Sequence, residues 1–360
     1  MNYLISLVLV GSFGLAGTPA ETDLTQLNRE LRTAIRNGSL ASAAELANKL
    51  DDAVQQRYSA WLIRDADERV REVLAWLPGD MESLWVNQEP FIIKPEESVG
   101  VLWGRPIQVY SMDRLAALDH GNMYRALGNA TVRLVVAAGR NLREGQLGIP
   151  GPMTTQDVAY FYFFADPVKL PSPDESVQGR PVWRLTAKID SGASPQPGVR
   201  RTQREDENWI ALARPDLLIL VNRRELLGQV LKQADGKPTT RALAADLPEW
   251  AHVDQSAPFW GLRHYTAQSK PKRGEPGFGL ADLPRPDGSA IGVTVQFDPA
   301  RQRLEIRYLS GGRPRQLNLD RQFQVEHPET GVWRLLSDVQ ARGPWPVHFA
   351  LSTLGFGEYR

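Results

Sequence analysis

The sequence contains no cysteine, and its charged side chains balance one another. None of the 360 residues is Cys, which excludes thiol catalysis, thiolate metal sites, disulfides and lipidation of an N-terminal cysteine. Lys and Arg together number 42, as do Asp and Glu, so the formal net charge is zero. A neutral chain without a clustered basic stripe offers no electrostatic attraction to nucleic acid or anionic lipid. We therefore expect no nucleic-acid partner.

Common catalytic and cofactor motifs are missing too. The sequence has no GxxxxGK[ST] phosphate loop, no GxGxxG after a strand pattern, no GxSxG nucleophile turn and no HExxH. Histidine is scarce, with 5 residues in the chain. We expect no cofactor and no metal site, and the sequence leans against an enzyme without deciding the question.

Long hydrophobic runs are confined to the N-terminus. Leu4 to Leu15 is an uncharged, mostly apolar run, which has the length of a signal-peptide core and is short for a membrane span. Thr18 and Ala20 are small residues placed like the −3 and −1 positions of a cleavage site, although no Lys or Arg precedes the run. Residues 1–20 are therefore predicted to be a signal peptide cleaved near Ala20. The mature chain is predicted to be secreted or periplasmic, with no integral membrane span.

What is present predicts an α+β protein. Hydrophobic residues make up 42% and charged residues 23% of the chain, an ordinary globular composition. Apolar residues at helical spacing predict a helical N-terminal region over 21–77. Beyond it, consecutive hairpin patterns predict mainly antiparallel sheet with packed helices. The predicted parts are 78–235, an α+β domain or first half, and 236–360, a β-rich second half. Leu77-Pro78 and Leu247-Pro248 each precede a Trp-containing strand pattern, which predicts that the two halves are related.

Several individual elements follow from local patterns. The aromatic run 158–164 is the strongest strand signal, and 209–213 with 217–221 and 291–297 with 303–309 are predicted hairpins. A helix is predicted over 223–232 and helical patterning over 113–142. The mixed-charge segment 191–207 is predicted to be a solvated loop. The segments 332–337 and 347–354 are predicted to be strands.

The segment LPEWAHVDQSAPFWGLRHY, residues 247–265, concentrates residue types that carry chemistry. A glycosidase needs two carboxylates beside the sugar, and Glu249 and Asp254 next to aromatic side chains could supply them. A metal site would need His252, Asp254 and His264 together, and of these His252 and Asp254, at i,i+2, share one face of a strand. The spacing to His264 is poor for a metal site. The candidates are Glu249, Asp254, His252 and His264 for catalysis, and Trp250, Trp260 and Arg263 for binding.

A structural interpretation of the same segment competes with the catalytic one. Asp254 or Ser256 makes a turn, and 257–265 forms a strand. One face would then hold Phe259, Gly261, Arg263 and Tyr265, and the other Trp260, Leu262 and His264. In this interpretation Arg263 pairs with a carboxylate and holds two layers in register.

Several segments together resemble a group of uncharacterised exported bacterial proteins. The matching pieces lie within 76–360 and are WLPGDMESLWVNQEPF, ARPDLLILVNRRELLGQVL, LPEWAHVDQSAPFWGLRHY, AIGVTVQFD and LGFGEY. The resemblance implies an exported α+β protein and assigns no activity, cofactor or site residue.

The sequence thus predicts a non-enzymatic binding or structural-interaction protein of the cell envelope, whose partner is an envelope protein or a glycan. One alternative is a carbohydrate-binding or carbohydrate-processing protein, because Trp is abundant. A second alternative is a protein–protein adaptor that acts through the N-terminal helices.

Overall fold

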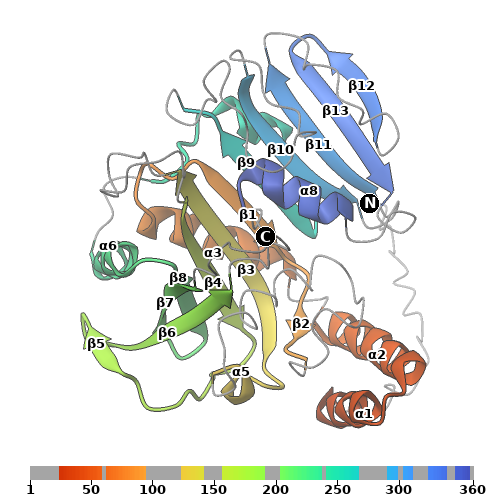
Figure 1. Ribbon diagram of the computed structural model, residues 1–360. Coiled ribbons are helices and arrows are strands. Elements are labelled where there is room, and N and C mark those ends of the chain that lie inside the picture. Colours follow the sequence, from red (N-terminus) through yellow and green to blue (C-terminus); the bar gives the residue numbers. More distant parts are fainter. Residues whose placement is uncertain are drawn as a thin grey trace, which may run out of the picture.

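A single antiparallel sheet of 13 strands organises the molecule (Figure 1). The computed structural model describes residues 24–58, 62–94, 123–141, 156–190, 203–236, 241–266, 290–298, 303–310, 323–338 and 345–356. The predicted signal peptide and the Gly/Pro-rich segment 267–288 lie outside these residues. The predicted α+β class agrees with this architecture, in which the sheet dominates.

The strands follow the chain from residue 83 to residue 338. Their bounds are β1 Ser83–Asn87, β2 Phe91–Ile92, β3 Thr131–Asn141, β4 Gln156–Phe164, β5 Glu175–Val177, β6 Arg180–Asp190, β7 Gln203–Arg214, β8 Leu217–Val221, β9 Phe259–His264, β10 Ala290–Asp298, β11 Arg303–Ser310, β12 Gln324–Glu329 and β13 Val332–Asp338. The order across the sheet is β12-β13-β11-β10-β9-β1-β3-β4-β8-β7-β6-β5, and β2 pairs with β3.

Strands β1 and β9 meet in the middle of this order, although their first residues, Ser83 and Phe259, are 176 positions apart in the chain. Trp85 lies opposite Gly261, and the pairing runs from Ser83 with Arg263 to Asn87 with Phe259. The middle of the sheet is therefore built by segments from both predicted halves.

Side chains alternate across β1 and are buried on both faces. Trp85 joins a hydrophobic cluster that includes Phe259 and Tyr160, whereas Leu84 and Val86 join a second cluster on the opposite face. Strand β9 behaves in the same way, because Phe259 belongs to the first cluster and Trp260 and Leu262 to the second; Tyr265, just after the strand, also joins the first. The predicted strand 257–265 is thus formed over 259–264, and the alternation predicted for its faces is confirmed there.

Helices cover both faces of the sheet (Figure 1). Their bounds are α1 Leu24–Arg36, α2 Leu40–Tyr58, α3 Leu62–Trp76, α5 Met123–Ala126, α6 Arg224–Asp235, the 3-10 helix η4 Pro248–His252, and α8 Trp345–Leu354. Buried side chains of α3 and α6 join the cluster of Leu84, and those of α8 join the cluster of Trp85. The predicted helical N-terminal region is thus seen in part, as α1, α2 and α3.

Helices α1 and α2 form a hairpin with its own small core. Ile92 of β2 joins this core, which fixes the hairpin against the sheet. Beside it, Lys94 Nζ lies 2.7 Å from Asp51 Oδ1, and both side chains are buried. The hairpin therefore depends on an apolar contact and on a buried ion pair.

The strands on the two sides of the β1–β9 pair are arranged alike. On one side β1 is followed across the sheet by β3, β4, β8 and β7, and on the other side β9 is followed by β10, β11, β13 and β12. On each side the last two of these strands stand in the reverse of their order in the chain. The helices that follow these strands in the chain, α6 after β8 and α8 after β13, lie on opposite faces of the sheet. Helix α6 packs in the cluster of Leu84 and α8 in the cluster of Trp85. The predicted domain boundaries remain predictions.

The C-terminal strand prediction for 347–354 is wrong, because this segment belongs to helix α8. Pro346 lies in the first turn, where a missing backbone N–H costs nothing. Val347, Ala350, Leu351 and Leu354 are buried and follow the i, i+3, i+4, i+7 spacing of a helix.

Two further predictions need correction. Within the predicted helical segment 113–142, the described residues form only the short helix α5 and then strand β3. Strand β3 is buried on both faces, so its apolar run lacks the alternation that marks a half-exposed strand. The mixed-charge residues 203–207 belong to β7 and pair with β6, because ladder hydrogen bonds use the backbone; residues 191–202 lie outside the described residues.

Candidate functional site

The segment singled out by the sequence forms η4, a turn and strand β9. Asp254 Oδ1 accepts hydrogen bonds from the backbone N of Ser256, at 3.0 Å, and from its Oγ, at 2.6 Å, so Asp254 makes the predicted turn. His252 Nδ1 lies 3.7 Å from Glu329 Oε1 at the side of the sheet away from β1. The structure does not bring these two candidates together with Glu249 and His264.

The binding candidates are used in packing. Trp260 is buried, and Trp250 donates from Nε1 to the carbonyl of Ala244 over 2.9 Å. The two indoles meet edge to face, with centroids 6.1 Å apart. The guanidinium of Arg263 lies over the ring of Tyr265, 5.3 Å from its centroid. The predicted pairing of Arg263 with a carboxylate is not seen among the residues that the structure describes.

Glu249 and His264 form a close pair. Glu249 Oε1 lies 2.9 Å from His264 Nδ1, the glutamate side chain is 0% exposed and the histidine side chain is 29% exposed. Glu249 Oε2 is also buried, and it has no hydrogen-bond partner among the residues that the structure describes. A Cβ on Gly292 would overlap the Glu249 carboxylate, so the absence of a side chain at Gly292 makes room for it.

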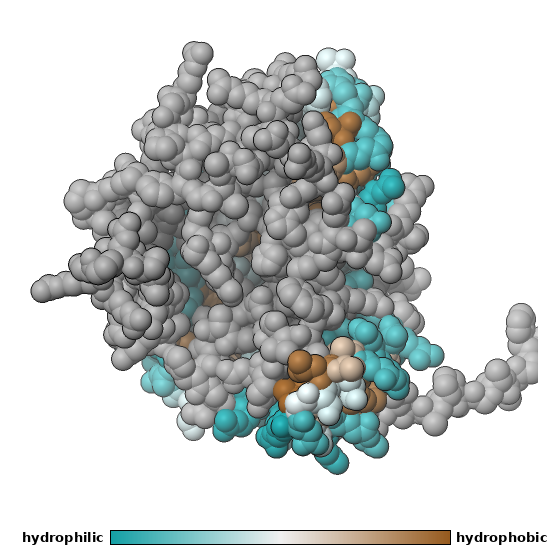
Figure 2. Space-filling view, turned by 45° about the vertical axis from the view of Figure 1, so that its right-hand side comes forward, coloured by the Kyte–Doolittle hydropathy of each residue, from teal (hydrophilic) through white to brown (hydrophobic). Residues whose placement is uncertain are grey.

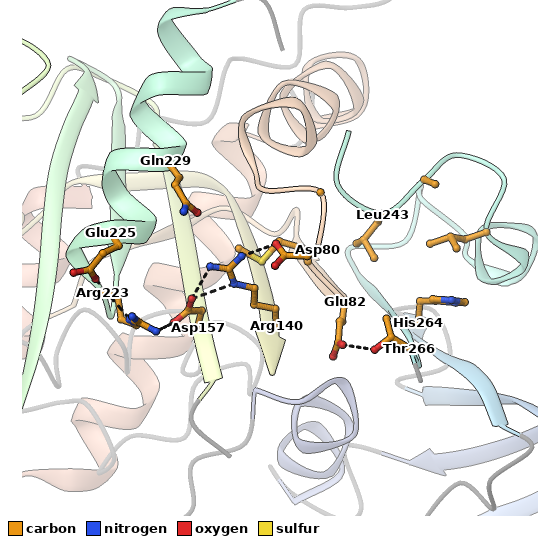
Figure 3. A pocket seen from close by; sticks show the side chains of 14 residues that line it. Asp80, Glu82, Arg140, Asp157, Arg223, Glu225, Gln229, Leu243, His264 and Thr266 are labelled. Carbon is orange, nitrogen blue, oxygen red and sulfur yellow. Dashed lines mark hydrogen bonds and ion pairs between the residues drawn. The ribbon is translucent and has the colours of Figure 1, made fainter. Parts of the chain in front are cut away.

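His264 lines a pocket of about 620 Å³ (Figure 3). The pocket lies where the ends of β1, β3, β4 and β9 approach the start of α6 and the segment 243–247. Its lining residues are Gly79, Asp80, Met81, Glu82, Arg140, Asp157, Arg223, Glu225, Gln229, Leu243, Ala244, Leu247, His264 and Thr266. Of the seven sequence candidates, only His264 is among them.

One side of the pocket is a network of four charged side chains, drawn at the left of Figure 3. Asp157 Oδ2 accepts from Arg140 Nε at 3.1 Å and Nη2 at 2.9 Å, and Asp157 Oδ1 lies 3.5 Å from Arg223 Nη1. Arg140 Nη1 donates to Asp80 Oδ1 over 2.5 Å. Burial acts to lower the pKa of Arg140, but its hydrogen bonds to Asp80 and Asp157 outweigh burial and raise that pKa.

The other side of the pocket joins acidic and apolar groups. Thr266 Oγ1 donates to Glu82 Oε1 over 2.6 Å, and the backbone N of His264 donates to the carbonyl of Glu82 over 2.8 Å. Met81, Leu243 and Leu247 supply apolar surface. The arrangement can bind a small molecule that is polar at one end and apolar at the other.

Sequence analysis missed most of this lining because the residues come from distant segments. Asp80, Arg140, Asp157 and Arg223 lie at or next to the ends of strands and helices, and 17 to 66 positions of the chain separate each from its partner in the network. The one available signal was polar residues next to strongly apolar strands, as at Asp157 before the aromatic run of β4.

No protein-family model matches the chain, and no curated protein matches it. Among solved structures, crystal form III of TP0453 is similar over 74% of this chain and 92% of that chain, with 10% sequence identity and a TM-score of 0.32. A similarity of this degree carries no argument about function.

None of the helices described is both long and apolar enough to cross a membrane. In the part of the chain that the structure describes, no three His, Asp or Glu side chains are grouped so that they could hold a metal ion.

Proposed function

We propose that the protein is a non-enzymatic binding protein of the cell envelope and that it binds a small polar ligand in the pocket beside His264. The observation that carries the proposal is the pocket itself, about 620 Å³ in volume and lined by charged side chains from several elements. Asp157, with a side chain 2% exposed, and Glu82, 6% exposed as a residue, show that charge is held in a sheltered place. Preformed concave sites with a few converging polar groups are typical of ligand binding.

The envelope location comes from the N-terminal pattern alone. The apolar run and the small residues near Ala20 favour export. Fusing residues 1–25 to a reporter that is active only outside the cytoplasm tests it. Reporter activity supports export, and activity confined to a cytoplasmic reporter contradicts it.

A pair of matched substitutions tests the binding site. Ala244 lines the pocket and is exposed, whereas Ala245 is exposed and does not line it. Ala244→Trp should fill the pocket without disturbing the core, and Ala245→Trp adds the same side chain outside. A charge-varied set of small fragments should raise the melting temperature of the parent chain and of Ala245→Trp, but not of Ala244→Trp. The proposal is wrong if no fragment binds, or if Ala244→Trp leaves binding unchanged.

The adaptor alternative rests on apolar surface over the α1–α2 hairpin, seen in Figure 2. Leu40, at the start of α2, is 56% exposed. A photo-crosslinking residue at Leu40 should give one discrete protein adduct in cells, and the same residue at Lys49, an exposed position on α2, should give none. Equal adducts at both positions contradict this alternative.

The carbohydrate alternative finds less support. Among tryptophans whose side chains the structure describes, none is exposed, and Trp260 is fully buried. A sugar-stacking platform needs an accessible indole face.

A further inference from the structure

The pair Glu249–His264 is costly to build and lies at the wall of the pocket. A carboxylate with an unpartnered, buried oxygen loses hydration without full compensation. The sheet also forgoes a side chain at Gly292 to admit it. Such an arrangement does little for stability, so its effect on His264 is the better reason for it.

That effect is to fix the orientation of the imidazole. A carboxylate beside Nδ1 accepts its hydrogen, so in neutral His264 the proton lies on Nδ1 and Nε2 carries the lone pair. Nε2 makes no hydrogen bond within the described part of the chain, and His264 lines the pocket. The pocket thus gains a hydrogen-bond acceptor with a fixed direction.

The charge of the lining favours a cation. Among the described residues of the lining, Asp80, Glu82, Asp157 and Glu225 carry carboxylates, and Arg140 and Arg223 carry guanidinium groups. This described part of the lining therefore has a net formal charge of −2, in a chain whose formal net charge is zero. A cleft that concentrates one sign of charge attracts ligands of the other sign.

The apolar part of the lining indicates to what kind of chain the cationic group of the ligand is attached. Met81 and Leu247 border the acidic side, together with Leu243, which is 3% exposed. Leu243 has a φ of 52°, a left-handed conformation that is uncommon for a leucine. Strained residues of this kind gather at ligand-holding positions. A short hydrocarbon chain would fit against this wall.

We infer that the pocket recognises a primary ammonium group on a short hydrocarbon chain, with His264 Nε2 accepting a hydrogen bond from the ammonium and Glu249 acting as a positioning residue. This inference rests on the proposed function and names its ligand class. A free alkylamine and the side chain of a lysine share this chemistry.

Binding of three matched probes tests the ligand class. Pentylamine, pentanol and pentanoate share a hydrocarbon chain and differ in the charge of the head group. Titrations followed by NMR should show pentylamine binding at least tenfold more tightly than the other two, and Ala244→Trp should abolish it. Equal or tighter binding of pentanoate or pentanol in the same pocket overturns the inference and leaves the proposed function standing. If no probe or fragment binds, both are overturned.

Two substitutions test the role of Glu249 and His264. Glu249→Gln keeps the shape of the side chain and should weaken pentylamine binding at least tenfold, while changing the nitrogen chemical shifts of His264 that report its tautomer. Glu45→Gln, which alters an exposed carboxylate on α2, is the control and should change neither. His264→Gln should also weaken binding if Glu249→Gln fails to fold. Unchanged shifts and affinity in folded Glu249→Gln, or unchanged affinity in His264→Gln, contradict the inference.

Discussion

The buried ion pair between Lys94 and Asp51 should hold the α1–α2 hairpin on the sheet. Lys94 Nζ lies 2.7 Å from Asp51 Oδ1 and 2.9 Å from Oδ2, and the two side chains are 4% and 2% exposed. Lys94→Met removes the cation and leaves a carboxylate in a buried place. Loss of one partner of a buried pair costs about 3–5 kcal/mol, because the remaining buried charge loses its counter-ion.

The free energy of unfolding, measured with urea, should therefore fall by about 3–5 kcal/mol in Lys94→Met. Backbone amides of α1 and α2 should exchange faster with deuterium, because the pair joins this hairpin to the end of β2. The double substitution Lys94→Met with Asp51→Leu should recover most of the loss, since it leaves no buried charge behind.

Lys49 provides the control for this prediction. It forms an ion pair with Glu45 on α2, 2.7 Å long, with side chains 59% and 68% exposed. Solvent screens such a pair, so Lys49→Met should leave stability and exchange unchanged. Equal losses at Lys94 and Lys49, or a double variant that is less stable than Lys94→Met, would refute the reasoning.

Three further predictions concern packing and pH. Gly261→Ala should lower the free energy of unfolding by about 1–3 kcal/mol, because the new Cβ would lie 2.6 Å from Leu354 Cδ1; unaltered urea unfolding contradicts this. Gly292→Ala should displace the Glu249 carboxylate and change the nitrogen chemical shifts of His264. Unchanged shifts would show that the carboxylate does not need the space left by the missing side chain at Gly292. Burial raises the pKa of Tyr265 and Tyr308 above 10.0, so stability should be complete below pH 10 and fall above it, as unfolded phenols ionise first. Urea unfolding that is unchanged between pH 8 and 11 would contradict the last prediction.

Local patterns predicted those elements whose alternation of apolar and polar residues, or whose turn residues, lie within a few positions of the chain. The aromatic strand β4, the hairpins β7–β8 and β10–β11 and the two faces of β9 follow from alternation and turn chemistry. Local patterns did not predict β3 and α8, where burial removes the contrast between apolar and polar positions. A short apolar run then fits a strand or a helix equally well, and tertiary packing decides.

The site was less predictable than the fold because it depends on pairings across the sheet. Residue type alone marks His264 and Glu249 as catalytic candidates, but their contact follows from the packing of η4 on β9 and β10. Asp80, Arg140, Asp157 and Arg223 meet only when β1, β3, β4 and β8 are aligned. No spacing within the sequence encodes that alignment.

Mapping of amide chemical shifts during a fragment titration tests the central claim most directly. The account predicts that a bound fragment shifts the amides of 79–82, 223–229 and 243–247 together with His264, and that Ala244→Trp removes these changes. Shifts confined to other parts of the molecule, or fragment binding that persists in Ala244→Trp, would contradict the claim that this pocket is the binding site.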